Sequence, residues 1–229
     1  MWLCSPSCVV AAGEFSRSHL RMSCQCSCAG SHAATAGHVY SRGIALAGPS
    51  GVGKSTIIHA LMAKYPDKFG FSLSATTRQP RPGEVNGRDY QFLNRERFQE
   101  LIAQGEFVEH ADVHGNFYGT TKSAVDNVTS IGKIWLKDID CCGCQQLKKH
   151  PTFHPIFIMV VAPDEAELER RLRGRGTETE EVVQRRLRDA IEEMKQKDSG
   201  LFDRVVVNGT VEQCLRDLEA VLREAHLLD

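Results

Sequence analysis

Residues 48–55 constrain the fold of this chain more than any other segment. They read Gly-Pro-Ser-Gly-Val-Gly-Lys-Ser and fit the pattern G-x-x-x-x-G-K-[ST] at every position. A short apolar run at 44–47 precedes the pattern, and residues 54–64 repeat apolar side chains at the spacing of a helix. A strand, a glycine-rich turn and a helix in this order predict a loop that binds phosphate groups.

The residue types in this loop suit a nucleoside triphosphate. Glycines let successive backbone N–H groups converge on phosphate oxygens, and the N-terminus of the following helix adds partial positive charge. Lys54 is expected to reach the β- and γ-phosphates, and the Ser55 hydroxyl to ligate Mg²⁺. The loop alone does not say whether water or a second substrate accepts the phosphoryl group. The predicted ATP site in this segment comprises Gly48, Pro49, Ser50, Gly51, Val52, Gly53, Lys54, Ser55 and Thr56.

The overall charge of the chain excludes some classes of partner. Its 28 Lys and Arg residues nearly balance its 29 Asp and Glu residues, which gives a net charge of −1. A balanced chain has no overall field for nucleic acid or for an acidic membrane surface, so neither is expected as a partner. No apolar run approaches the roughly 18 residues that a membrane span needs, which predicts a soluble chain.

Residues 1–41 differ in composition from the rest of the chain. They are rich in Ser, Cys, Ala and Gly and show no sustained hydrophobic period, which predicts a disordered extension. Serine with scattered arginine and few acids is also compatible with an organelle transit peptide, and Met22 is an alternative start. A cytoplasmic location is expected, with the mitochondrion as the alternative.

Eight of the nine cysteines are crowded into two places and Cys214 stands alone, which argues against a disulfide framework. Reduced thiols are the preferred interpretation. Metal binding at 24–28 is the alternative, but C-x-C-x-C lacks the spaced pairs of a zinc finger. The cysteines are Cys4, Cys8, Cys24, Cys26, Cys28, Cys141, Cys142, Cys144 and Cys214.

Beyond the loop the chain alternates strands with helices, which predicts one α/β domain built on a parallel sheet. Asp164 with Glu167, and Thr210 with Gln213, have the spacing of a helix cap. Thr177 with Glu180 has it as well. Strands are expected at 69–76, 89–93, 107–113, 117–118, 134–140, 155–162 and 205–207, and helices at 95–104 and 121–128 and after each cap.

The segment 69–90 contains a second group of candidate phosphate ligands. Arg78 and Arg81 lie three residues apart on a proline-stiffened turn, close to several hydroxyl side chains. Two guanidinium groups held together suit a bidentate grip on a phosphate dianion. The alternative is a pair of solvated surface arginines.

A series of short motifs runs from about residue 42 to about residue 222. They are Gly48-Pro49-Ser50-Gly51, Thr76-Thr77-Arg78, Pro80-Arg81, Gly83-Glu84-Val85-Asn86-Gly87, Asp89-Tyr90, Tyr118-Gly119-Thr120, Asp138-Ile139-Asp140 and Arg175-Gly176-Thr177-Glu178-Thr179-Glu180-Glu181. In these motifs, in this order and at this spacing, the sequence resembles guanylate kinase.

The resemblance implies a P-loop NTPase-type parallel sheet flanked by helices within a domain at 42–229. It also implies a GMP-binding insert at about 74–121, a helical lid at about 171–198, and Mg²⁺-assisted transfer of the γ-phosphoryl group of ATP to GMP. A monomer with ATP and GMP as small-molecule partners is expected.

The resemblance also implies roles for individual residues. Asp138 is expected to contact magnesium through water, and Asn208 to lie near the adenine. Arg171, Arg175 and Arg186 belong to the lid, and the catalytic group is Lys54, Arg81, Arg175 and Arg186. The GMP phosphate is expected to contact Arg78, Arg81, Tyr90 and Tyr118, and the guanine Ser74, Glu109 and Asp140, with Thr120 where serine is usual.

The assignment of Glu109 is chemically reasonable. Guanine presents N–H donors at N1 and N2, and a carboxylate is a pure acceptor. Adenine has no donor at N1, so a buried Glu109 would be left unpaired against AMP, and penalties of this kind discriminate sharply between substrates.

Two departures from the family pattern bear on activity. Lys137 stands where the family has an apolar residue, and Cys142 replaces a common glutamine. A buried ammonium is costly unless it is paired, so we expect Lys137 to form a salt bridge with Asp138 or Asp140 and to perturb the metal site.

Two other functions compete with a guanylate kinase. One is a non-catalytic guanylate-kinase-like binding module, against which the intact phosphate loop counts. The other is a kinase for a different nucleoside monophosphate, against which Glu109 and Asp140 count.

Overall fold

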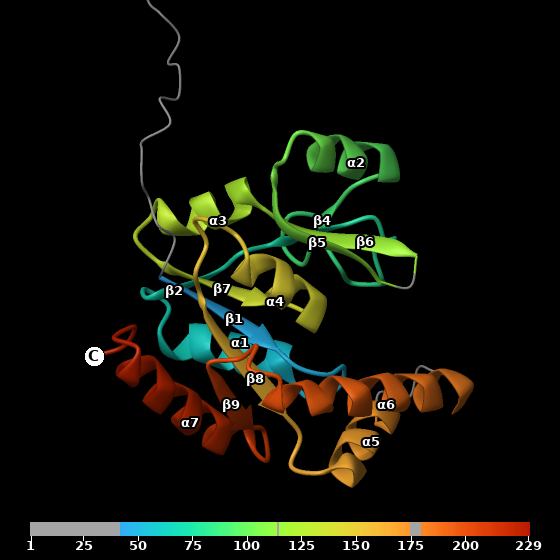
Figure 1. Ribbon diagram of the computed structural model, residues 1–229, viewed down its shortest axis with the longest axis vertical. Helices are drawn as coiled ribbons and strands as arrows, with labels where there is room; N and C mark the ends of the chain where they lie inside the picture. The colour runs from blue at the N-terminus through green and yellow to red at the C-terminus, as the bar shows by residue number, and fades with distance from the viewer. Residues whose placement is uncertain (1–41, 114, 175–179) are drawn as a thin grey trace, which may run out of the picture. The chain divides into compact units, whose positions relative to one another are not determined.

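A computed structural model describes residues 42–113, 115–174 and 180–229 of the chain. Its larger sheet contains five parallel strands in the order β2-β7-β1-β8-β9 (Figure 1). All neighbouring pairs in this sheet are parallel, which confirms the α/β class predicted from the alternation of strands and helices. The strands are β1 (Gly43–Ala47), β2 (Phe69–Phe71), β7 (Ile134–Asp138), β8 (Ile156–Val161) and β9 (Arg204–Val207).

Helices cover both faces of this sheet (Figure 1). The helices α1 (Lys54–Lys64) and α7 (Val211–Glu224) pack on one face, where Leu61 and Leu218 are fully buried. On the other face lie α3 (Lys122–Thr129) and α4 (Cys141–Lys148). Two further helices, α5 (Glu165–Arg173) and α6 (Glu180–Lys195), bury side chains in the same hydrophobic core as α1 and α7. The short helix η1 (Gln196–Asp198) follows α6.

A second sheet has four strands in the order β4-β3-β6-β5. In it β5 (Phe107–Val113), which has the predicted bounds, pairs antiparallel with β6 (Asn116–Thr121), which is longer than the strand predicted at 117–118. The other strands are β3 (Ser74–Thr76) and β4 (Gln91–Phe92), and α2 (Arg95–Ala103) covers this sheet through Phe98.

The single strand expected at 69–76 is wrong. The chain leaves the first sheet after Phe71, and Ser74 begins a strand of the second sheet. Ser72 marks the crossing, because its backbone N–H and its hydroxyl both donate to the Leu136 carbonyl at 2.9 Å. The strand expected at 89–93 is also shorter, since β4 comprises only Gln91 and Phe92, which pair with β3.

The capping residues set the helix starts as expected, and one helix was not foreseen. The side chains of Asp164 and Thr210 accept hydrogen bonds from the N–H groups three residues later. The cap expected at Thr177 lies outside the described residues. The unforeseen helix is α4, which Asp140 caps by accepting from the Gly143 N–H at 2.6 Å. Of the helices that the structure describes, none combines the length and apolar character that a membrane crossing requires.

Candidate active site

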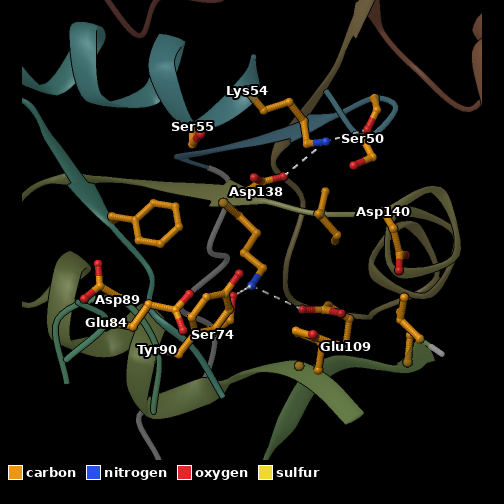
Figure 2. Close-up of a pocket in the computed structure, with 18 of the residues that line it drawn as sticks. Ser50, Lys54, Ser55, Ser74, Glu84, Asp89, Tyr90, Glu109, Asp138 and Asp140 are labelled. Carbon is orange, nitrogen blue, oxygen red and sulfur yellow. Dashed lines mark hydrogen bonds and ion pairs between the residues drawn. The ribbon is translucent and has the colours of Figure 1, made fainter. Parts of the chain in front are cut away.

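A cavity of about 500 Å³ lies at the carboxyl-terminal edge of the parallel sheet (Figure 2). The phosphate loop lines one end with Ser50, Lys54 and Ser55, and the second sheet lines the other end with Ser74 and Glu109. Strands β1 and β7 end beside each other, so the residues that follow them meet at this edge, where α/β sheets bind their ligands.

The backbone of the phosphate loop requires its glycines. Gly48, Gly51 and Gly53 have φ angles of 138°, 89° and 95°, a region that residues with a Cβ rarely adopt. A Cβ on Gly48 would also lie 2.1 Å from the carbonyl oxygen of Val160, closer than any real contact. The loop therefore keeps its tight course along strand β8 only with glycine at these positions.

The Lys54 ammonium is held at the centre of the loop. It donates to the Gly48 carbonyl at 2.5 Å and lies 3.6 Å from Oδ1 of Asp138. The Asp138 side chain is 38% exposed, so it faces the cavity rather than the core. A cation and a carboxylate thus stand side by side at the entrance of the expected triphosphate site.

Asn208 forms a hydrogen bond with the backbone of the phosphate loop. Its Nδ2 donates to the Val52 carbonyl at 2.8 Å, and its Oδ1 is buried with no hydrogen-bond donor among the described residues. The Arg171 guanidinium also donates to the carbonyls of Val52, at 3.2 Å, and of Asn208, at 2.8 Å. A second hollow here is lined by Thr56, Asn208 and Val211.

The opposite end of the cavity holds a buried carboxylate. Glu109 is 6% exposed and accepts a hydrogen bond from the Thr120 hydroxyl at 2.5 Å. Asp140 also lines the cavity, although one of its oxygens caps α4. The structure therefore brings Ser74, Glu109 and Asp140 together, as the resemblance implies, from three different elements.

Lys137 does not pair as expected. Its ammonium donates to the Ser74 hydroxyl at 2.5 Å and lies 3.7 Å from Oε1 of Glu109, rather than bridging Asp138 or Asp140. Successive side chains of a strand point to opposite faces, so Lys137 and Asp138 diverge at the end of β7. The expected perturbation of the metal site by a Lys137 salt bridge is therefore wrong.

The arginines of the 78–81 turn are arranged around Glu84. Arg78 donates to Glu84 at 2.9 Å, and its guanidinium lies 5.4 Å from the ring centre of Tyr90. The hydrogen bond from Arg78 lowers the pKa of Glu84 and raises the pKa of the arginine itself. Tyr90 and Tyr118 line the cavity, whereas Arg78 and Arg81 do not, and the Arg81 side chain is exposed.

Two of the three expected lid arginines lie in the described residues, Arg171 in α5 and Arg186 in α6. The Arg186 guanidinium donates to the Ser50 hydroxyl of the phosphate loop. Arg175, the third expected lid arginine, lies outside the described residues.

Glu193 was missed by sequence reasoning although it lines the cavity. Burial raises the pKa of this carboxyl group, and the nearby charges of Asp140 and Asp189 add to the effect. Glu193 follows Arg186 by two helical turns, so the two residues share a helix face. That spacing is the signal that would have identified it. His59, Glu84, Arg88 and Asp89 also line the cavity without having been assigned a role.

Comparison with known proteins shows the family. A family model described as guanylate kinase matches residues 40–225. Guanylate kinase 1 of Oryza sativa subsp. japonica is 49% identical over 180 residues, which are 78% of this chain and 47% of that protein. Human guanylate kinase is 46% identical over 184 residues, which are 80% of this chain and 93% of that protein. The chain thus spans about half of the rice protein and more than nine-tenths of the human one.

A solved structure agrees with these relatives. The crystal structure of guanylate kinase from Anaplasma phagocytophilum has a TM-score of 0.62 to this chain at 29% identity. The match covers 81% of this chain and 86% of that one. With its phosphate loop and its buried carboxylate at opposite ends of one cavity, the chain belongs to the guanylate kinase family of nucleoside-monophosphate kinases.

Proposed function

We propose that this chain transfers the γ-phosphoryl group of ATP to GMP and releases ADP and GDP. The observation that carries the proposal is one cavity lined by both Lys54 and Glu109. ATP would bind at the loop, and the guanine of GMP would donate hydrogen bonds to Glu109. The γ-phosphate of ATP and the phosphate of GMP would then face each other between Lys54 and Glu109. Family membership supports the same reaction.

The chemical step needs positioning and charge more than covalent participation by the protein. Lys54 and Arg186 already contact the loop, and both would turn their positive charge to the phosphate oxygens of bound ATP. Arg81 and Arg175 would complete the catalytic group. The acceptor phosphate is itself an anion, so no side chain has to remove a proton from it.

The GMP site is proposed to join the second sheet and the 78–81 turn. Tyr90 and Tyr118 line the cavity beside Arg78. The Arg78 guanidinium would release its hydrogen bond to Glu84 and bind the GMP phosphate instead. This exchange requires the insert at about 74–121 to move toward the phosphate loop. The lid at about 171–198 would close at the same time and exclude water, which would otherwise accept the phosphoryl group.

The residues near the loop fit a magnesium ion. Magnesium in phosphotransferases keeps several waters and takes only one or two protein ligands besides the substrate phosphates. The Ser55 hydroxyl and the Asp138 carboxylate both line the cavity, and Asp138 would contact the ion through water. When bound, the ion neutralises charge on the β- and γ-phosphate oxygens. The described residues contain no cluster of three or more His, Cys, Asp or Glu side chains able to hold a metal without substrate.

The adenine of ATP is proposed to bind near Asn208, which lines the second hollow together with Thr56 and Val211. The cytoplasmic location, its mitochondrial alternative and the monomeric state stay predictions.

The test is ADP formation by the purified chain from ATP and Mg²⁺, with GMP, AMP, UMP and dTMP as separate acceptors. Turnover with GMP and little with the others is the expected result. Preference for another acceptor would support kinase activity but reject the proposed recognition of guanine by Glu109. Binding of GMP with no turnover on any acceptor would instead support the non-catalytic module.

A further inference from the structure

Lys137 places a buried positive charge at the guanine end of the cavity. The residue is 3% exposed, and it lies in the central part of the sheet, where β7 pairs it with Ala45 of β1. From there its side chain reaches the second sheet, where the ammonium meets Ser74 and Glu109. Figure 2 shows Ser74 and Glu109 at the end of the cavity opposite Lys54 and Ser50.

This ammonium has unused hydrogen-bonding capacity. It carries three N–H donors and no acceptor. Among the described residues only the Ser74 hydroxyl accepts from it within hydrogen-bond distance, because the Glu109 oxygen is 3.7 Å away. Since Lys137 lines the cavity, a donor is available to a bound ligand beside the acceptor carboxylate.

Guanine matches this donor and acceptor pair. Its O6 is an acceptor. The N1–H group beside O6 and the N2 amino group beyond N1 are donors. Adenine reverses the pattern, with an amino donor at position 6 and an acceptor at N1. We propose, on the basis of the proposed kinase function, that Lys137 donates a hydrogen bond to O6 of GMP while Glu109 accepts from N1–H and the N2 amino group. Lys137 thereby selects a 6-oxopurine directly.

A purely structural lysine would behave differently. If Lys137 only neutralised Glu109, its removal would weaken every guanine-like acceptor alike. A direct bond to O6 makes the effect depend on the atom at position 6. The analogue 6-thio-GMP keeps N1–H and N2 and replaces O6 by sulfur, a much weaker acceptor, so it separates the two roles.

The experiment measures kcat/KM for GMP and for 6-thio-GMP in the wild-type chain, Lys137→Met and the control Lys149→Met. Lys149 is exposed and lies outside the cavity. Hydrogen bonds to charged groups support a loss of about tenfold or more in kcat/KM for GMP in Lys137→Met. The loss for 6-thio-GMP should be much smaller, so the ratio between the two acceptors falls by about tenfold. Lys149→Met should keep the wild-type ratio.

An unchanged ratio in folded Lys137→Met would overturn the proposal, and thermal melting establishes that the variant is folded. If that variant does not fold, the wild-type chain still decides, because equal kcat/KM for GMP and 6-thio-GMP rejects a bond to O6. No turnover of GMP by the wild-type chain would reject the kinase function itself. Turnover of GMP with an unchanged ratio would reject only the role of Lys137.

Discussion

The ammonium of Lys54 lies 3.6 Å from the Asp138 carboxylate, which joins the phosphate loop to the end of strand β7. The two residues are far apart in the sequence and meet because β1 and β7 are parallel neighbours. The pair holds the Lys54 ammonium beside the backbone of the phosphate loop. In the proposed reaction the same pair would keep the carboxylate next to a hydrated magnesium ion.

Replacing Lys54 by methionine should lower kcat on the order of 10²- to 10³-fold, because a preorganised cation facing the transferring phosphoryl group is lost. Steady-state ADP formation at saturating ATP and GMP measures the effect. Lys149→Met, which changes an exposed lysine outside the cavity, should keep the wild-type rate. Wild-type turnover in Lys54→Met would show that the loop is not the donor site.

Asp138→Asn should raise the Mg²⁺ concentration needed for half-maximal rate by about tenfold or more, because groups that orient metal-bound water have effects of this size. Titration of the rate with Mg²⁺ at fixed ATP gives the value. Asp126→Asn, in α3 outside the cavity, is the matched control. The assignment of Asp138 fails if both variants require the same Mg²⁺ concentration.

Arg81→Ala should lower kcat/KM for GMP by about tenfold to a hundredfold, the range for a lost hydrogen bond between charged groups. Its side chain is exposed, so the melting temperature should not change. Arg97→Ala removes another exposed arginine, paired with Glu100 on α2, and should leave the kinetics unaltered. Equal kinetics in the two variants would contradict the phosphate-binding role of Arg81.

Glu84→Gln should lower the melting temperature at pH 7 by about 1–3 °C. The hydrogen bond from Arg78 lowers the pKa of Glu84 below its ordinary value of 4.5, so ionised Glu84 stabilises the folded state above pH 4.5. That contribution disappears as the pH falls through the lowered pKa. The difference between wild type and variant should therefore shrink on acidification below pH 4.5. A difference that is constant with pH would exclude this explanation.

Glu193→Gln should have the opposite effect. Burial raises the pKa of Glu193 above 4.5, so the ionised form destabilises the folded state as the pH rises through the raised pKa. At pH 7 the melting temperature of the variant should be about 1–4 °C higher than that of the wild type. At pH 4 the two melting temperatures should be the same. Thermal melting across this pH range measures the effect. Glu192→Gln changes the exposed neighbour and should show no such trend.

Several elements follow from local patterns in the sequence. The helix expected at 54–64 and the strand expected at 107–113 have the observed bounds. Each of these elements depends on residues that are close together in the chain. A glycine-rich turn, a capping side chain or an apolar period is complete within one or two helical turns, so it can be recognised without the rest of the fold.

The partner of Lys137 and the position of Glu193 in the cavity were decided by the tertiary structure. Lys137 and Ser74 are 63 residues apart in the chain, and no local pattern distinguishes a bond to Ser74 from one to Asp138. The crossing between sheets at Ser72 likewise depends on a distant carbonyl, that of Leu136. Buried polar groups take whichever partners the packed elements bring to them, because an unpaired group in the interior is costly. The sequence therefore determined the phosphate loop and the class of fold, and the packing of β3, β5 and β7 decided which charges meet at the Glu109 end of the cavity.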